Sequence, residues 1–365
     1  MTAAKRGLDA PHRRTERSVE RGPRILEKLA VNAYAATTWV VAHVPERLSR
    51  WVIGTGSQGG YLFLPTKRRW SNANFGHVVG LSPDHPRVRR LALAAYRQYA
   101  RYLVEVMHLE TQSVEEAGSK VAQADLDHIE TVWRGSKGGL IFVLGHVGNN
   151  EAVAAAVAAR GWPINVVADD SSFPEMFERF RRLREAWGAH VIPWRNLREI
   201  YTVLRRREML ALLIDWGYRA DGIPVRLFGA WTTLPAGPAT LAAKTNSRIL
   251  PLAIRRTPDG LFHVSYAPTI EVASGSPADL QRATQSVADA LAESVAAAPQ
   301  QWYSFKPMWP STVEESAELE RRAATMLANE RPRDGHDGRS RAPEGSEDDV
   351  APAASAAPWP EASEA

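Results

Sequence analysis

The chain has 365 residues, of which 44% are hydrophobic and 24% are charged, and its formal net charge is +4. This length is sufficient for one large α/β domain or two small ones. The sequence contains no cysteine, which excludes disulfides, cysteine-ligated zinc and thiol catalysis within this chain.

The charge is distributed unevenly. Residues 330–365 carry four Arg against nine Asp or Glu, whereas the rest of the chain carries 41 basic and 32 acidic side chains. A basic body favours anionic partners such as phospholipid head groups, coenzyme phosphates or nucleic acid. A solvated, mildly basic surface would have the same composition, so charge alone does not choose among these possibilities.

The N-terminal region contains one uncharged apolar run. Residues 1–24 mix basic and acidic side chains without the apolar core of a secretory signal, which predicts a flexible basic arm. His43 is the only titratable side chain in residues 29–45, and the run is shorter than the roughly 20 residues of a spanning helix. Trp39 and the following Arg47 are typical of an interfacial helix. A true span and a buried core helix are the alternatives.

The folded unit is predicted to cover residues 25–325, because no repeat or long linker interrupts them. Its first part, residues 25–135, is expected to be helical, with residues 86–108 showing helical spacing of apolar side chains. Its second part, residues 136–312, is expected to be the α/β catalytic part. Residues 326–365 are rich in Pro, Ala, Ser and acidic side chains and are predicted to be disordered.

Short apolar runs alternate with amphipathic stretches in the second part. Strands are predicted at residues 140–144, 164–168, 191–194, 210–214, 225–228, 249–254 and 262–266. Helices are predicted at residues 150–160, 174–187, 197–207, 236–245 and 278–298. This alternation predicts a mostly parallel sheet with helices on both faces, in which ligands bind at the carboxyl ends of the strands.

Two polar residues follow strands of this sheet. His146 lies just beyond strand 140–144, and Asp215 directly follows strand 210–214, so both are expected on the same rim. A histidine beside a carboxylate is a general base with an orienting partner. Because the chain has neither cysteine nor a Gly-x-Ser-x-Gly elbow, His146 would have to activate a substrate hydroxyl directly.

A third candidate, Glu151, lies in the first turn of the helix that follows. Gly145 and Gly148 let the chain turn sharply between strand and helix. Asp170 also lies just past a strand end, but no partner for it is evident. A His-x4-acid spacing alone is weakly specific, and a solvated or capping histidine is the alternative.

The sequence Gly145-His146-Val-Gly-Asn-Asn-Glu151 resembles the His-x4-acid block of the lysophospholipid acyltransferase superfamily. The surrounding sequence is similar to the bacterial lipid A lauroyl/myristoyl acyltransferase family, and within it to the branch that acylates phosphatidylinositol mannosides. The similar blocks, which span roughly residues 25–312, include Phe180-Arg-Arg-Leu-Arg184-Glu-Ala-Trp-Gly188, Leu213-Ile-Asp215-Trp-Gly and Leu234-Pro-Ala-Gly237-Pro238-Ala.

The resemblance implies an O-acyltransferase in which His146 is the general base and Glu151 the orienting carboxylate. It implies supporting or substrate-binding roles for Arg184, Asp215, Asn149 and Asn150. The implied reaction moves a fatty acyl group from acyl-CoA or acyl-carrier protein to a hydroxyl of a glycolipid such as a phosphatidylinositol mannoside. No metal and no other cofactor are expected, and the implied location is the cytoplasmic face of the cell membrane, by peripheral association.

The chain departs from the family in one segment. Many members have a second acidic residue where this chain has Ile214-Asp215-Trp216, which leaves the role of Asp215 open. Arg184 belongs to an Arg-rich helix, and the alternative is that it is one of a row of solvated arginines without a role in the site. The stripe of Phe177, Phe180 and Trp187 fits either the core or an acyl-chain groove.

Two other functions are compatible with the sequence. A thioesterase or hydrolase would use the same site with water as the acceptor. A non-enzymatic nucleic-acid-binding protein would explain the basic body, but the folded core has no helix-turn-helix, zinc spacing or aromatic RNA-binding strand motif. The acyltransferase is therefore the leading hypothesis, with a membrane lipid and no nucleic acid as partner.

Overall fold

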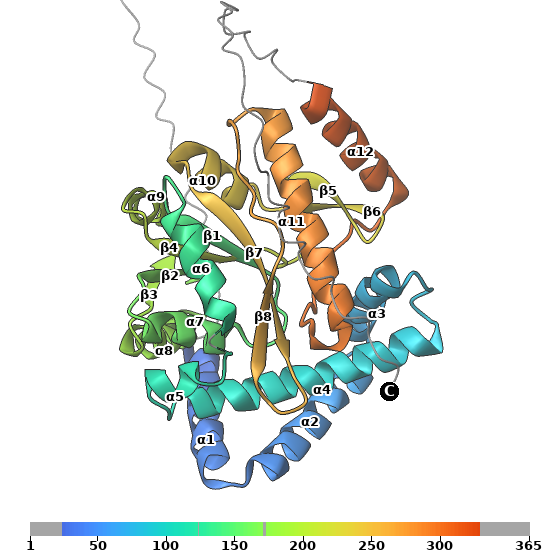
Figure 1. Ribbon diagram of the computed structural model, residues 1–365. Coiled ribbons are helices and arrows are strands. Elements are labelled where there is room, and N and C mark those ends of the chain that lie inside the picture. Colours follow the sequence, from blue (N-terminus) through green and yellow to red (C-terminus); the bar gives the residue numbers. More distant parts are fainter. Residues whose placement is uncertain (1–23, 123, 171–172, 329–365) are drawn as a thin grey trace, which may run out of the picture.

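The computed structural model describes residues 24–122, 124–170 and 173–328 (Figure 1). Most of the predicted arm (1–24) and tail (326–365) lies outside the described residues. Arg24 is the first residue of the first helix, and the last helix includes residues 326–328, which were assigned to the tail.

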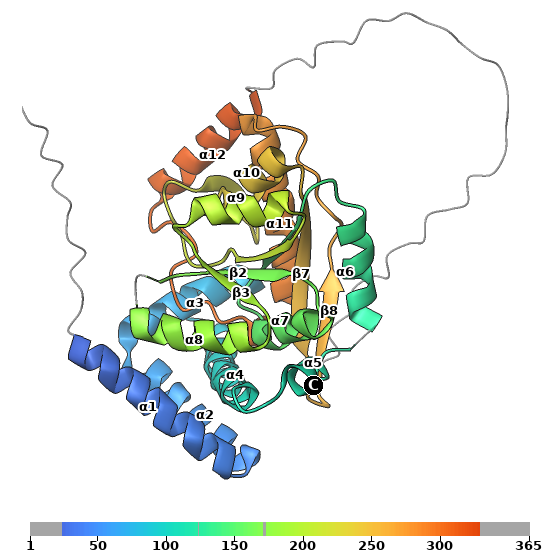
Figure 2. The same ribbon diagram turned by 90° about the vertical axis from the view of Figure 1, so that its left-hand side faces the viewer.

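The first part of the chain is helical, as predicted. Its helices are α1 (Arg24–His43), α2 (Glu46–Phe63), α3 (Pro65–Val79), α4 (Pro86–Leu109), α5 (Val114–Gly118) and α6 (Ala124–Arg134). Helix α4 begins at a proline whose fixed φ suits the first turn, and the His85 side chain accepts a hydrogen bond from the Arg87 N–H there. Helices α1 and α2 lie together at the edge of the molecule, beneath α4 (Figures 1 and 2).

A six-stranded sheet forms the centre of the second part. Its strands are β1 (Leu140–Leu144), β2 (Ile164–Ala168), β3 (His190–Pro193), β4 (Met209–Leu213), β7 (Arg248–Arg256) and β8 (Phe262–Tyr266), in the spatial order β3-β2-β4-β1-β7-β8. All neighbours are parallel except β7 and β8. The predicted α/β fold with a mostly parallel sheet is thus confirmed.

The predicted strand 225–228 lies outside this sheet. It is β5 (Ile223–Leu227), which pairs antiparallel with β6 (Ala230–Leu234), a strand that the sequence did not indicate. The two are joined by Phe228 and Gly229, both with positive φ (49° and 76°). A two-residue turn of this kind usually has the sequence Asn-Gly or Asp-Gly. Because Phe228 stands at its first position, the sequence did not indicate the hairpin.

Helices cover both faces of the sheet. They are α7 (Asn150–Ala159), α8 (Pro174–Ala186), α9 (Leu197–Arg205), α10 (Gly237–Thr245), α11 (Pro277–Ala297), the short 3-10 turn η1 (Pro299–Gln301) and α12 (Val313–Ala328). Alternate residues of β1 face two separate cores, with Ile141 packed among residues of α9, α10 and α11 and Phe142 among those of α6 and α7. Figure 2 shows α7 and α8 on one side of the sheet and α9 and α10 on the other.

Helix α1 contains most of the uncharged run 29–45. It packs against α4 and α8 through Val41 and Tyr34, yet it exposes Trp39 to solvent. Helix α1 is therefore only partly buried, and the alternative of a buried core helix for this run is wrong. Within the described ranges, no helix is both long and apolar enough to cross a membrane.

Candidate active site

His146 and Asp215 lie opposite each other, just beyond the ends of two neighbouring strands. Strands β1 and β4 are parallel and pair in a register that aligns Leu144 with Leu213, and each polar residue follows its strand by two positions. The imidazole Nδ1 lies 2.5 Å from Asp215 Oδ1, and the backbone N–H of His146 donates to Asp215 Oδ2 at 2.8 Å. Because an ionised carboxylate only accepts, Nδ1 bears the proton and Nε2 is left as the base.

A third donor fixes Asp215. Trp302 Nε1 donates to Oδ2 at 2.8 Å, and only 2% of Asp215 is exposed. Burial by itself raises the pKa of Asp215, but the charge and hydrogen bonds of His146 together with the Trp302 bond outweigh it and lower the pKa below its ordinary value. Asp215 therefore stays ionised beside the imidazole at neutral pH.

The basicity of His146 follows from these contacts. Burial disfavours its charged form, but the charge and hydrogen bond of Asp215 outweigh burial and raise the pKa of His146 above the ordinary histidine value. Lys306 acts in the opposite direction through its positive charge. The imidazole side chain is 29% exposed and can be reached by a substrate.

The turn between β1 and α7 depends on its two glycines. A Cβ on Gly145 would lie 2.6 Å from a Leu291 methyl and 3.1 Å from Asp215 Oδ2. Gly148 has φ +67°, and a Cβ there would lie 2.3 Å from the carbonyl oxygen of Ile254. Both close approaches require glycine, as the sequence indicated for this turn.

Glu151 contacts Arg184 rather than the imidazole. The two oxygens of Glu151 accept from Arg184 Nε at 2.9 Å and from Nη2 at 2.6 Å, and both side chains are largely buried. No hydrogen bond or ion pair joins Glu151 to His146 in the described part of the chain. The carboxylate that contacts the imidazole is Asp215, because Glu151 on α7 pairs with Arg184 on α8, whereas His146 lies on the preceding loop.

Asn149 and Asn150 form the start of α7. The Asn149 side chain accepts from the Ala152 N–H at 3.2 Å and so caps the helix. Asn150 Nδ2 donates to the Gly145 carbonyl at 3.3 Å, while its buried Oδ1 has no hydrogen-bond partner among the described residues. Asn150 also lines a cavity that contains His146.

A buried ion pair supports the same turn from below. Arg256, with 1% of its side chain exposed, donates to both oxygens of Glu105 at 2.6 Å, and Asn149 Nδ2 lies 3.4 Å from one of them. Breaking such a pair leaves an uncompensated buried charge and costs about 3–5 kcal/mol. Sequence reasoning missed this network, because its members lie far apart in the sequence, on α4, on β7 and at the residue that precedes α7.

The segment that follows α11 runs beside the histidine loop. Gly148 N–H donates to the Gln301 carbonyl at 3.2 Å, and Tyr303 N–H donates to the His146 carbonyl at 2.8 Å. These contacts bring Trp302 and Lys306 to the site. This irregular segment has no periodic pattern or motif from which the positions of Trp302 and Lys306 could have been predicted.

Two cavities meet at His146. One, of about 340 Å³, is lined by polar and aromatic side chains: Lys67, Tyr99, Tyr102, Asn150, Asp215, Trp216, Tyr303, Ser304, Phe305 and Lys306. The other, of about 670 Å³, is a largely apolar groove along α8 whose lining includes Val166, Phe173, Met176, Phe177, Phe180, Trp194 and Leu213. Phe177 and Phe180 of the predicted stripe thus face a groove, whereas Trp187 is buried in the core.

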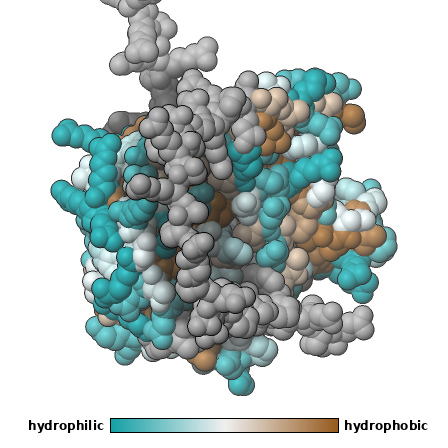
Figure 3. Space-filling model, turned by 45° about the horizontal axis from the view of Figure 1, so that its top comes forward, coloured by the Kyte–Doolittle hydropathy of each residue, from teal (hydrophilic) through white to brown (hydrophobic). Residues whose placement is uncertain are grey.

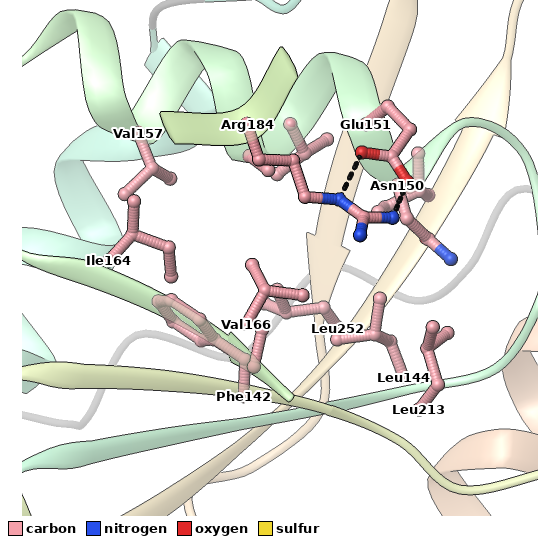
Figure 4. Close-up of a pocket in the computed structure, with 14 residues that line it drawn as sticks. Phe142, Leu144, Asn150, Glu151, Val157, Ile164, Val166, Arg184, Leu213 and Leu252 are labelled. Carbon is pink, nitrogen blue, oxygen red and sulfur yellow. Dashed lines mark hydrogen bonds and ion pairs between the residues drawn. The ribbon is translucent and has the colours of Figure 1, made fainter. Parts of the chain in front are cut away.

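A narrower apolar cavity continues from this groove between α7 and the sheet. Figure 4 shows the Arg184–Glu151 pair at one side of it, above the apolar side chains of Phe142, Val166 and Leu252. Arg184, Val166 and Leu213 line both cavities. His146 therefore stands between a polar pocket and an apolar space, which suits a substrate pair with a polar acceptor and an alkyl chain.

The fold and this arrangement are those of an enzyme that can activate a hydroxyl beside an apolar chain, and comparison with known proteins identifies the class as acyltransferase. The chain belongs to the bacterial lipid A biosynthesis acyltransferases, whose family model matches residues 19–311. It is similar to the phosphatidylinositol mannoside acyltransferase of Mycolicibacterium smegmatis (29% identical over 282 residues, 76% of this chain and 90% of the relative). It is also similar to that of Mycobacterium tuberculosis (27% over 301 residues, 80% and 92%). The expected acyltransferase class is confirmed.

Proposed function

We propose that the chain transfers a fatty acyl group from a thioester, acyl-CoA or acyl-carrier protein, to a hydroxyl of a glycolipid such as a phosphatidylinositol mannoside. The observation that carries the proposal is the His146–Asp215 pair at the junction of a polar pocket and an apolar groove. The activity of the two mycobacterial relatives, which are phosphatidylinositol mannoside acyltransferases, supports the acceptor class.

In the proposed reaction, the acceptor hydroxyl lies in the polar pocket and gives its proton to Nε2 of His146. Its oxygen attacks the thioester carbonyl and forms a tetrahedral intermediate. When the intermediate collapses, the C–S bond breaks and the thiol leaves with the proton from His146. Asp215 stabilises the transient imidazolium and holds the ring in the productive tautomer without taking the proton itself.

The apolar groove along α8 would take the acyl chain. Phe173, Met176 and Phe177 offer it an apolar wall next to His146, and the narrower cavity beyond the Arg184–Glu151 pair extends that wall between α7 and the sheet. The Arg184–Glu151 ion pair allows two charged groups to line an apolar space without net charge, because each is hydrogen-bonded by the other.

Peripheral membrane attachment would bring the lipid acceptor to this site. More than half of the exposed large apolar side chains in the described ranges lie on or between α1 and α3: Leu29, Trp39, Val40, Leu48, Trp51, Val52, Leu62, Phe63 and Leu64. Helix α1 contacts α8, which lines the groove, so a membrane bound to α1 would lie beside the entrance for the acyl chain. The cytoplasmic face is the proposed side, since acyl-CoA and acyl-carrier protein are made there.

Apolar residues are also distributed unevenly on another face of the molecule. On the face shown in Figure 3, hydrophilic side chains predominate on the left, and hydrophobic residues gather on the right, the side of α3 and α12. This uneven distribution is typical of a surface that meets a lipid or protein partner. The exposed apolar side chains that carry the proposed attachment lie on α1, on α2 and at Leu64, which precedes α3.

The experiment that tests the proposal is thiol release from palmitoyl-CoA, and then from palmitoyl-carrier protein, with and without lipid extract as acceptor. Release that requires both His146 and added lipid supports the transferase. Release of the same size without acceptor would indicate a thioesterase on the same site. No release from either donor would contradict the proposed donors.

A further inference from the structure

Two lysines from distant segments line the pocket that contains His146. Lys67 lies on α3, and Lys306 lies between η1 and α12. Neither forms an ion pair with a carboxylate among the described residues, although most other cations near the site do. Two unpaired positive charges in one pocket make that pocket a site of positive potential.

Lys306 is held close to the reacting groups. Its Nζ lies 3.6 Å from the centroid of the Trp216 ring, and that ring lies 5.9 Å from the imidazole of His146. Lys67 is held in the same way by Trp70, at 4.6 Å from the ring centroid. Each aromatic face restrains an ammonium group that has no carboxylate partner.

The two charges oppose each other. Burial and the charge of Lys67 lower the pKa of Lys306, and the carboxylate of Asp169 acts against them with a smaller effect. Because Lys67 repels Lys306 more than Asp169 attracts it, the free pocket carries an unfavourable interaction that a bound anion would remove. The cavity has room for more than an anion, at about 340 Å³, and polar and aromatic side chains such as Tyr99 and Tyr102 also line it, so the anion is expected to be attached to a larger polar group.

We propose that Lys67 and Lys306 form a subsite for a phosphate ester of the substrate, placed so that the neighbouring hydroxyl or thioester meets His146. The inference rests on the proposed function, because it assigns the phosphate to a substrate of that reaction. The phosphate has two possible sources with the same chemistry: the phosphodiester of an acceptor head group, or the phosphates of coenzyme A. A point charge on a flexible stem suits either.

The subsite has a consequence for the base. Asp215 raises the pKa of His146 and Lys306 lowers it. Lys67 lines the same pocket. A phosphate bound at these lysines would offset the effect of Lys306 on the imidazole. His146 would thus become a stronger base when the substrate is bound than in the free enzyme.

Binding can be measured without turnover. We would titrate the full chain with myo-inositol 1-phosphate, coenzyme A and inorganic phosphate by calorimetry, using the wild type, Lys67→Met, Lys306→Met and Lys306→Arg. Lys244→Met is the matched control, since Lys244 is an exposed lysine near the Tyr201 ring (6.0 Å) and lines none of the three cavities described above. Loss of a hydrogen bond to a charged group predicts about tenfold weaker binding for either Met variant, with binding largely restored in Lys306→Arg.

The arms separate the sources. If the Met variants weaken inositol phosphate alone, the phosphate belongs to the acceptor; if they weaken coenzyme A alone, it belongs to the donor. Equal binding by the wild type and both Met variants, or no binding of any probe to the wild type at millimolar concentration, would overturn the subsite. The same titrations on the His146→Ala variant separate the phosphate subsite from the proposed acyl transfer. Binding that depends on the lysines in this variant would support the subsite even if the acyl transfer assay failed.

Discussion

Asp215 contacts His146 through both of its carboxylate oxygens, one at the imidazole Nδ1 and the other at the backbone N–H of the same residue. The carboxylate therefore fixes both the ring and the chain that bears it. The pairing follows from sheet register, because Leu144 and Leu213 are aligned on adjacent parallel strands. A side chain positioned in this way is placed by the register of the sheet, although it lies on the loop that follows the strand.

Replacing His146 by Ala should remove the general base. We expect acceptor-dependent thiol release to fall by roughly 10²–10⁴-fold. Because the buried Asp215 loses its imidazole partner, the variant should also be less stable, and a melting curve checks that it folds. His190→Ala is the matched control, because His190 pairs with Glu199 at the surface, far from both cavities at His146, and such pairs contribute little. Equal activity of His146→Ala and the control would show that the base is another group.

Replacing Asp215 by Asn should change the pH dependence as well as the rate. In the wild type Asp215 raises the pKa of His146, so activity should rise with pH through a value above the ordinary histidine range. Without that charge, burial and Lys306 both lower the pKa, so the rising limb of kcat/KM should move to lower pH while the plateau falls. A limb that stays in place would contradict the role of Asp215, and a melting curve of the variant checks that it folds.

Glu151 requires a test that separates the role implied by the family motif from the role its contacts indicate. Breaking the buried Arg184–Glu151 pair with Glu151→Gln should cost about 3–5 kcal/mol of folding stability. The double variant Glu151→Gln with Arg184→Met should be more stable than the single one, since no unpaired guanidinium is left buried. Chemical denaturation measures both.

The pH profile then decides the catalytic part. If Glu151 only braces α7 against α8, Glu151→Gln lowers the rate without moving the rising limb of kcat/KM. If Glu151 acts on the imidazole as the sequence predicted, the limb moves as it does in Asp215→Asn. The second result would show a contact in the substrate complex that differs from the one with Arg184.

The sequence was sufficient for those parts of the site that depend on local pattern and sheet rules. Apolar runs located β1 and β4, and the rule on carboxyl ends placed His146 and Asp215 on one rim. The partner of Glu151 was not predictable, because it depends on how α8 crosses α7. Trp302 and Lys306 were missed for a related reason: their irregular segment is positioned by backbone hydrogen bonds to His146 and Gly148, which leave no periodic pattern.

The N-terminal helices allow a separate test of membrane attachment. Trp39 and Trp51 are each 64% exposed, and replacing both by Ser would remove two amphipathic rings from the proposed membrane face. Because burying a large apolar side chain contributes about 1.5–3 kcal/mol, partition onto vesicles should fall by at least tenfold, as measured by sedimentation with anionic phospholipids.

Val313→Ser with Leu327→Ser is the matched control, since both side chains are exposed on α12, away from α1 and α2. Activity on a micelle-dispersed acceptor should be unchanged in the Trp variant, because Trp39 and Trp51 line neither cavity at His146. Unchanged vesicle binding would place the membrane contact elsewhere on the chain, whereas equal loss in the control would show that binding follows general surface hydrophobicity and not this face.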